Sequence, residues 1–240
     1  FVQTSLARDA FDWVGYLGKD EIYFESAFPT LSLMEHGQGN WLVERLYKIK
    51  HAFLDSLGRV IKEPQVSLLG GLLVGAKNSL GKDILDDFRT AGLIHIVVLS
   101  GYNVMIIAVY LMRVLKSFLP EAVGVAVGIV SILLFALMAG GGSATVRASI
   151  MAVIALVGRG TGRVYLATNA LIVAGLLMLL HNPKILVFDT GFQLSFLATL
   201  GLIYIAPEIE KNLGWVPERI FKFLPFRELV ATTTSAQLAV

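Results

Sequence analysis

Three polar side chains, His95, Ser100 and Asn103, interrupt an apolar run of the chain. Polar groups in hydrocarbon are costly unless protein or water satisfies them, and inside membrane segments they mark functional paths. On one unbroken helix His95 and Ser100 lie about 140° apart, so they share a path only if the helix breaks at Gly92 or Gly101. We therefore predict a pathway or gate at His95, Ser100, Gly101 and Asn103. The alternative is that Ser100 bonds to its own helix and His95 to a neighbouring one.

A second segment, residues 140–147, combines three glycines with Ser143 and Thr145. Flexible backbone at the start of a helix presents amide groups that can face an anion. Arg147 adds a fixed positive charge whose geometry suits phosphate. The segment therefore predicts an anion site. The alternative, which stays equally open, is a tight turn whose arginine reaches for the membrane surface.

A third segment, residues 188–196, carries aromatic and polar side chains: Phe188, Phe192 and Phe196 at spacings of four, with Asp189, Gln193 and Ser195 among them. On one helix the phenylalanines form a stripe, and Asp189 and Gln193 form a parallel polar stripe. The aromatic stripe serves either helix packing or contact with nucleobases. Asp189 is either part of a polar pathway or the N-cap of the helix.

The composition places these segments in a membrane protein. The mean hydropathy is +0.71 and 16% of the residues are charged, whereas soluble domains carry about a quarter. Apolar runs cover residues 93–112, 122–139, 144–157, 165–180 and 190–206. A bilayer core of about 30 Å needs about 20 helical residues. We therefore expect an all-α polytopic membrane domain of about five transmembrane helices, with short or broken segments at the third and fourth runs.

The other segments are expected at or outside the membrane surface. Residues 1–40 are the least hydrophobic, and the strand-like composition of residues 21–27 predicts a short β-like remnant of an extracytoplasmic domain. Residues 41–64 predict an amphipathic interfacial helix, whose apolar face consists of Leu42, Leu46, Ile49, Phe53 and Leu57. Residues 65–240 form the membrane-embedded domain. Within it, residues 65–76 are too short to span, residues 77–89 hold a short polar helix, and residues 207–227 lie at the surface.

The ends of the chain predict a piece of a longer protein. Its first residue is Phe1 and no signal-peptide pattern follows, while a new apolar run begins at Ala236, near the other end. We therefore expect further parts on both sides.

Loop charges predict the orientation. If each apolar run crosses once, one side collects the basic residues Arg113, Lys116, Arg159, Arg163, Lys211, Arg219, Lys222 and Arg227. The other side has Arg147 and Lys184 between runs, and Lys77, Lys82 and Arg89 before the first. The richer side should be cytoplasmic, which places residues 1–90 outside.

Several kinds of site are excluded or disfavoured. The chain has no cysteine, so disulfides and thiolate metal sites are excluded. Its 4 histidines lack metal-ligand spacing. The glycine-rich stretch before Lys77 misses the phosphate-loop spacing by one residue. We expect no metal, no cofactor and no enzymatic activity.

Three segments together resemble the ComEC family of DNA-uptake channels: residues 91–104, 144–148 and 188–196. Residues 72–77 and Asn182-Pro183 match family positions in the same order, and residues 11–28 resemble the end of the family's N-terminal OB-type domain. The family run usually has histidine where this chain has Asn103, which can form hydrogen bonds but cannot be protonated. His95 is therefore the only titratable candidate in that segment.

The resemblance implies a channel that carries single-stranded DNA across the bacterial cytoplasmic membrane during natural transformation. It implies as partners the lipid bilayer, a DNA receptor and a separate cytoplasmic ATPase, because no ATP motif is present in the chain. In such a channel Arg147 would meet phosphates, the aromatic stripe would contact bases, and residues 95–103 would form the constriction. The alternatives are a transporter of small anions or lipid-linked substrates, an intramembrane serine hydrolase built on Ser100 and His95, and a membrane assembly platform.

Overall fold

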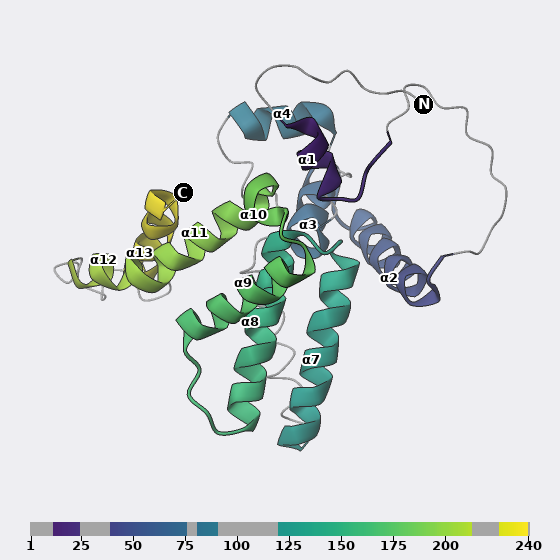
Figure 1. The fold of residues 1–240 in the computed structure, drawn as a ribbon. Helices are drawn as coiled ribbons and strands as arrows, with labels where there is room; N and C mark the ends of the chain where they lie inside the picture. Colours follow the sequence, from purple (N-terminus) through teal and green to yellow (C-terminus); the bar gives the residue numbers. More distant parts are fainter. Residues whose placement is uncertain (1–11, 25–38, 76–80, 91–119, 213–225, 240) are drawn as a thin grey trace. The chain divides into compact units, whose positions relative to one another are not determined.

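The computed structural model describes residues 12–24, 39–75, 81–90, 120–212 and 226–239 (Figure 1). These residues form helices and the turns between them, and they contain no β-strand. The chain divides into two compact units. The first consists of Phe1–Ala27 and Leu166–Val240, and the second of Phe28–Tyr165.

The second unit contains the helices α2 (Trp41–Gly58), α3 (Gln65–Val74), α4 (Lys82–Thr90), α7 (Glu121–Met138) and α8 (Ser143–Gly160). α7 and α8 pack against each other, and α2 contacts both α3 and α7. The buried side chains of Ile132, Phe135 and Leu156 form the centre of the α7–α8 contact. Among the described helices of this unit, α7 and α8 form the most extensive contact, which van der Waals packing of these side chains stabilises.

The first unit contains α1 (Trp13–Gly18), α9 (Ala167–His181), α10 (Ile185–Phe188), α11 (Thr190–Tyr204), α12 (Ala206–Asn212) and α13 (Phe226–Ala239). α11 contacts α9, α10, α12 and α13. Small residues allow these helices to approach closely, since Gly175 of α9 lies against the ring of Phe196 and Gly201 lies against the backbone of Ser235. α11 is therefore the element around which this unit is built.

The predicted apolar runs coincide with described helices from residue 122 onward. The runs 122–139, 144–157 and 165–180 correspond to α7, α8 and α9, and the run 190–206 corresponds to α11 and the start of α12. The run 93–112 lies outside the described residues. The helical nature of these four runs is thus confirmed.

The number of spans stays a prediction. Among the described residues, α8 is the one single helix that is both long and apolar enough to cross a membrane. α11 and α12 together pass the same test, with a bend of 41° between them. α3, α9 and the Ala122–Met138 part of α7 are apolar but shorter. α8 continues through Arg159 and has 18 residues, so it is longer than the apolar run 144–157 predicted.

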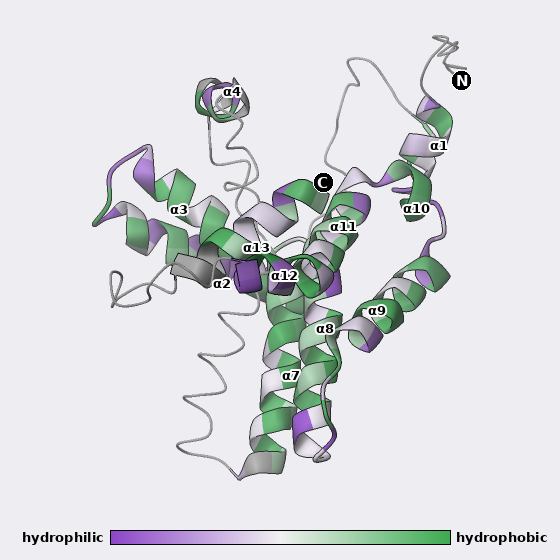
Figure 2. Ribbon diagram, turned by 90° about the vertical axis from the view of Figure 1, so that its left-hand side faces the viewer, coloured by the Kyte–Doolittle hydropathy of each residue, from purple (hydrophilic) through white to green (hydrophobic). Residues whose placement is uncertain are grey.

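The outer faces of these helices are apolar. Figure 2 shows hydrophobic residues along most of α7, α8 and α9. On α9 the side chains turned away from the unit include Ile172, Leu176 and Leu180, which are 63%, 56% and 73% exposed. A helix that is hydrophobic on all sides is typical of a membrane environment or of the interior of a large protein.

The N-terminal segment differs from the prediction. Residues 21–24, the described part of the strand-like stretch, form no strand, and α1 occupies Trp13–Gly18. Asp12 begins this helix by accepting a hydrogen bond from Gly15 N at 2.9 Å. Glu21 then adopts a φ of +58°, so its backbone is not in the extended conformation of a strand.

The predicted segment 41–64 is helical over α2 (Trp41–Gly58), which Asn40 caps by accepting from Leu42 N at 2.9 Å; its place at the membrane surface stays a prediction. Leu46 is buried in its unit, and so is Lys50. Ile49 and Phe53, in contrast, are 61% and 39% exposed. The predicted apolar face is thus divided, with one part packed inside the unit and its flank exposed.

Candidate functional site

The anion-site candidate lies at the start of α8. Gly140 and Gly141 have φ values of +93° and +63°, a left-handed conformation that only glycine adopts readily. Gly142 is the N-cap, and the first hydrogen bond of the helix runs from Val146 N to Gly142 O at 2.9 Å. The amides of Ala144 and Thr145 make no hydrogen bond to a described residue, as the first turn of an α-helix requires. The three glycines thus build the helix start that the sequence predicted.

Arg147 follows one turn later and is partly buried. Its Nη1 donates to the sulfur of Met151 at 3.8 Å, a weak acceptor on the same face of the helix. It also interacts electrostatically with Tyr165, which follows α8. The guanidinium therefore lies in the helix that is long enough to span, near the end that carries partial positive charge.

The second described group of candidates lies where α10 meets α11. Asp189 is the N-cap of α11, and its Oδ1 accepts from Phe192 N at 3.0 Å. The N-cap interpretation of Asp189 is therefore confirmed as its structural role. Gln193 Nε2 donates to Leu186 O at 2.8 Å and to Val187 O at 3.1 Å, the carbonyls that end α10. Ser195 Oγ donates to Phe192 O at 3.0 Å within the helix.

The aromatic stripe is shorter than predicted. The backbone leaves the helical region at Asp189, so Phe188 belongs to α10 and does not continue the stripe of α11. Phe192 and Phe196 do stack, with ring centroids 4.3 Å apart. Phe192 is only 4% exposed and Phe196 packs against Gly175. In the first unit these rings therefore serve helix packing.

The structure brings Asp189, Phe192, Gln193 and Ser195 together and places Arg147 in the other unit. The candidates His95, Ser100, Gly101 and Asn103 lie outside the described residues. Within the described parts of the chain, no three His, Asp or Glu side chains gather in a way that could hold a metal ion.

One contact between distant parts of the first unit was not predicted from the sequence. Asn182 and Lys184, in the turn between α9 and α10, donate hydrogen bonds to the end of α1. Lys19, beside that end, forms an ion pair with Asp20 at 2.7 Å. This hydrogen bond raises the pKa of Lys19 against the effect of burial, and the charges of Asp20 and Asp189 raise it further. The Asn182-Pro183 pair was the only signal in the sequence, because it marks a turn.

Comparisons with known proteins point to one family. The family model described as competence protein matches residues 72–240. ComE operon protein 3 of Bacillus subtilis (strain 168) is 22% identical over 214 residues, which cover 85% of this chain and 26% of that protein. An uncharacterized protein of Aquifex aeolicus (strain VF5) is 27% identical over 176 residues, or 71% of this chain and 41% of that protein. The chain thus spans about a quarter of the first relative and about two fifths of the second. No solved structure gives a significant match.

Proposed function

Because the chain belongs to the ComEC family of competence proteins, we propose that it forms part of a channel for single-stranded DNA across the bacterial cytoplasmic membrane. The matched residues 72–240 include every candidate segment from residue 95 onward. The lipid bilayer, a DNA receptor and a separate cytoplasmic ATPase are the proposed partners. The channel needs no catalytic residue of its own, because transport through it breaks no covalent bond.

The observation that carries this proposal is the start of α8. A left-handed glycine turn presents first-turn amides, and Arg147 follows in a helix long enough to span the bilayer core. Amides at a helix N-terminus and a guanidinium both favour phosphate oxygens. A strand of DNA has such oxygens at every nucleotide, so Arg147 provides a binding site for a backbone phosphate.

The other candidates have supporting roles in this proposal. The segment with Asp189, Phe192, Gln193 and Ser195 forms a rigid corner at one entrance. Gln193 joins α11 to α10, and the contacts of the other three side chains stabilise the first turns of α11. His95, Ser100, Gly101 and Asn103 form the constriction. A break of the helix at its glycines would place their polar groups on one path.

The test is DNA uptake by the full-length protein, expressed from a plasmid in a strain that lacks its own copy. Arg147→Gln removes the charge, and Arg147→Lys keeps the charge but loses the planar two-donor geometry. Arg159→Gln is the matched control, because Arg159 is exposed in the last turn of the same helix. Uptake of fluorescently labelled DNA is measured per molecule of protein in the membrane.

We expect uptake to fall about tenfold in the Gln variant, which corresponds to about 1.4 kcal/mol, and less in the Lys variant. Uptake by Arg159→Gln should stay unchanged. Equal uptake by Arg147→Gln and wild type at equal membrane levels would contradict the proposal. If the protein is instead a transporter of small anions, DNA uptake should not depend on Arg147, and deletion of the whole gene should leave transformation unchanged.

A further inference from the structure

The carbonyl end of α1 is bound by side chains from a distant part of the chain. Lys184 Nζ donates to Gly18 O at 3.1 Å, and Asn182 Nδ2 donates to Lys19 O at 2.7 Å. The last carbonyls of a helix lack partners within it and carry partial negative charge. An amide donor and an ammonium group therefore suit this end. The two hydrogen bonds join residues that are 163 and 166 positions apart in the sequence.

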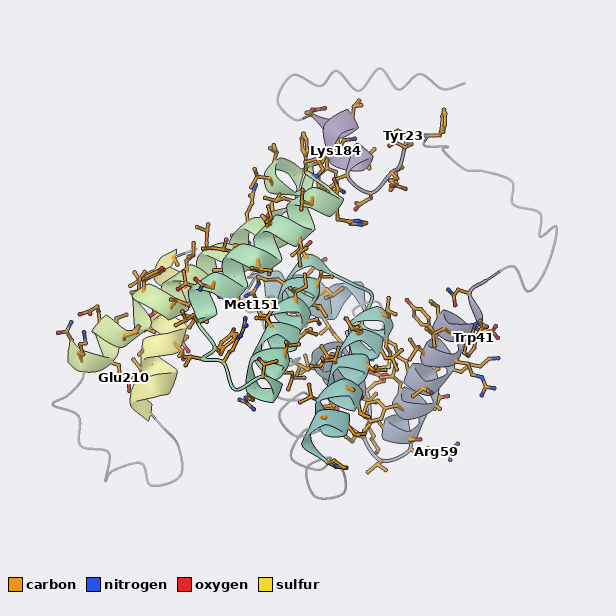
Figure 3. The ribbon with its side chains drawn as sticks, turned by 60° about the horizontal axis from the view of Figure 1, so that its bottom comes forward. Tyr23, Trp41, Arg59, Met151, Lys184 and Glu210 are labelled. Atoms are coloured by element: carbon orange, nitrogen blue, oxygen red, sulfur yellow. The ribbon has the colours of Figure 1, made fainter. Side chains whose placement is uncertain are left out.

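The contact is also closely packed. A Cβ atom on Gly15 would collide with the ring of Phe188, and one on Gly18 would lie 3.0 Å from Lys184 Nζ. Figure 3 shows Lys184 and Tyr23 at this end of the first unit, and Figure 1 shows α1 beside α10. Glycine at both positions thus allows α1 to lie directly on α10.

The same corner holds the beginning of α11. Asn182 Oδ1 accepts from Lys184 N at 3.1 Å, which shapes the turn that leads into α10. Gln193 of α11 then binds the carbonyls of Leu186 and Val187. A displacement of α10 must therefore move the Asp189 end of α11.

We propose that residues 12–24 are a positioning strap, which docks on the turn between α9 and α10 and so fixes the Asp189 end of α11. This inference rests on the proposed function, because that end is a proposed entrance of the DNA pathway. Loop charges place residues 1–90 and Lys184 on the same side of the membrane, which the contact requires. The strap thereby links the extracytoplasmic N-terminal part of the protein to the helices of the pathway.

Two substitutions loosen the strap from opposite sides. Asn182→Asp keeps the oxygen that accepts from Lys184 N but replaces the donor to Lys19 O with a second acceptor. Gly15→Ala adds a methyl group against the ring of Phe188 and beside the capping carboxylate of Asp12. Asn40→Asp is the matched control, because Asn40 uses its oxygen to cap α2 and aspartate caps equally well.

The readout is the position of the strap in the full-length protein in native membranes. Spin labels on cysteines at the exposed positions Tyr23 and Leu186 report the distance between the strap and α10. Residues 1–240 contain no cysteine, and any cysteine elsewhere in the full-length protein is first replaced by serine. We expect one narrow distance distribution in the otherwise unchanged protein and in Asn40→Asp, and broad distributions with longer distances in Asn182→Asp and Gly15→Ala.

DNA uptake is measured on the same substitutions without the labels, at equal membrane levels. We expect uptake to fall several-fold with both loosening substitutions and to be unchanged with Asn40→Asp. A narrow distribution in both loosened variants, or full uptake despite a broad one, would overturn the inference. Because the distance is measured without DNA, failure of the Arg147 test would overturn the pathway and leave the docking result standing.

Discussion

At the residue scale, the structural and the electrostatic role of Asp189 can be tested separately. Its Oδ1 caps α11, and a neutral amide oxygen at the same place caps a helix about as well. Asp189→Asn should therefore leave the free energy of unfolding of the purified protein nearly unchanged, whereas Asp189→Ala should lower it by about 1 kcal/mol. Thermal unfolding measured by intrinsic fluorescence gives both values.

DNA uptake by the same two variants decides what else the carboxylate does. If Asp189 acts only as a cap, uptake should follow stability and Asp189→Asn should transport DNA normally. A stable Asp189→Asn protein with impaired uptake would contradict a purely structural role and would assign a function to the charge.

At the element scale, α11 and α13 cross at a distance that only glycine permits. A Cβ atom on Gly201 would lie 2.6 Å from Ser235 O and 2.7 Å from Ala239 Cβ, and neither is the end of a flexible side chain. We expect Gly201→Ala to separate the helices and to lower the free energy of unfolding by about 1–3 kcal/mol. Gly124→Ala is the control, because a Cβ there meets no described atom within 4 Å. Equal thermal stability of the two variants would show that the crossing is looser.

Lys50 makes the contact between α2 and α7 sensitive to pH. Its Nζ donates to Met138 O at 3.2 Å, at the negative end of α7. Burial lowers the pKa of Lys50 below the ordinary value of 10.5, so the unfolded chain holds this proton more tightly than the native protein. The cost of burying the charge is fully present below the lowered pKa. It disappears as the pH rises from there to 10.5.

We therefore expect that loss of the Lys50 proton raises the unfolding temperature of the wild-type protein as the pH approaches 10.5. Lys50→Met should lack this rise. Lys48→Met is the matched control, since Lys48 lies exposed on the same helix beside Glu44. The comparison is made as a difference between each variant and wild type at each pH, which removes the titration of other groups. Parallel curves for wild type and Lys50→Met would contradict the prediction.

The helices could be predicted from the sequence, but their contacts could not. Apolar runs and their periodicity are local signals, so α2, α7, α8, α9 and α11 fall where the runs predicted. The strap depends on side chains that bind backbone carbonyls more than 160 positions away, and such bonds leave no periodic trace. The role of Asp189 was ambiguous for another reason. An aspartate can be the N-cap of a helix or a polar residue within one, and the sequence alone does not distinguish the two.

At the scale of the whole molecule, two contacts bear on the orientation in the membrane. The strap binds the turn before α10, and α2 binds the end of α7 through Lys50. Each contact requires an N-terminal segment and a loop between apolar runs to lie on one side of the bilayer. The charge-based orientation meets both requirements, since it places residues 1–90 and the loops that follow α7 and α9 outside.

Single cysteines in the full-length protein test this orientation directly, after any cysteine outside residues 1–240, which contain none, has been replaced by serine. A maleimide that cannot cross membranes should label Lys62→Cys in intact cells, and it should label Arg163→Cys only after the cells are made permeable. Both positions are exposed and lie outside the helices, so a lack of reaction reflects the side of the membrane and not burial. Labelling of both in intact cells would show that the chain between them crosses an even number of times. That outcome would leave the α2–α7 contact intact only if α8 did not cross the membrane.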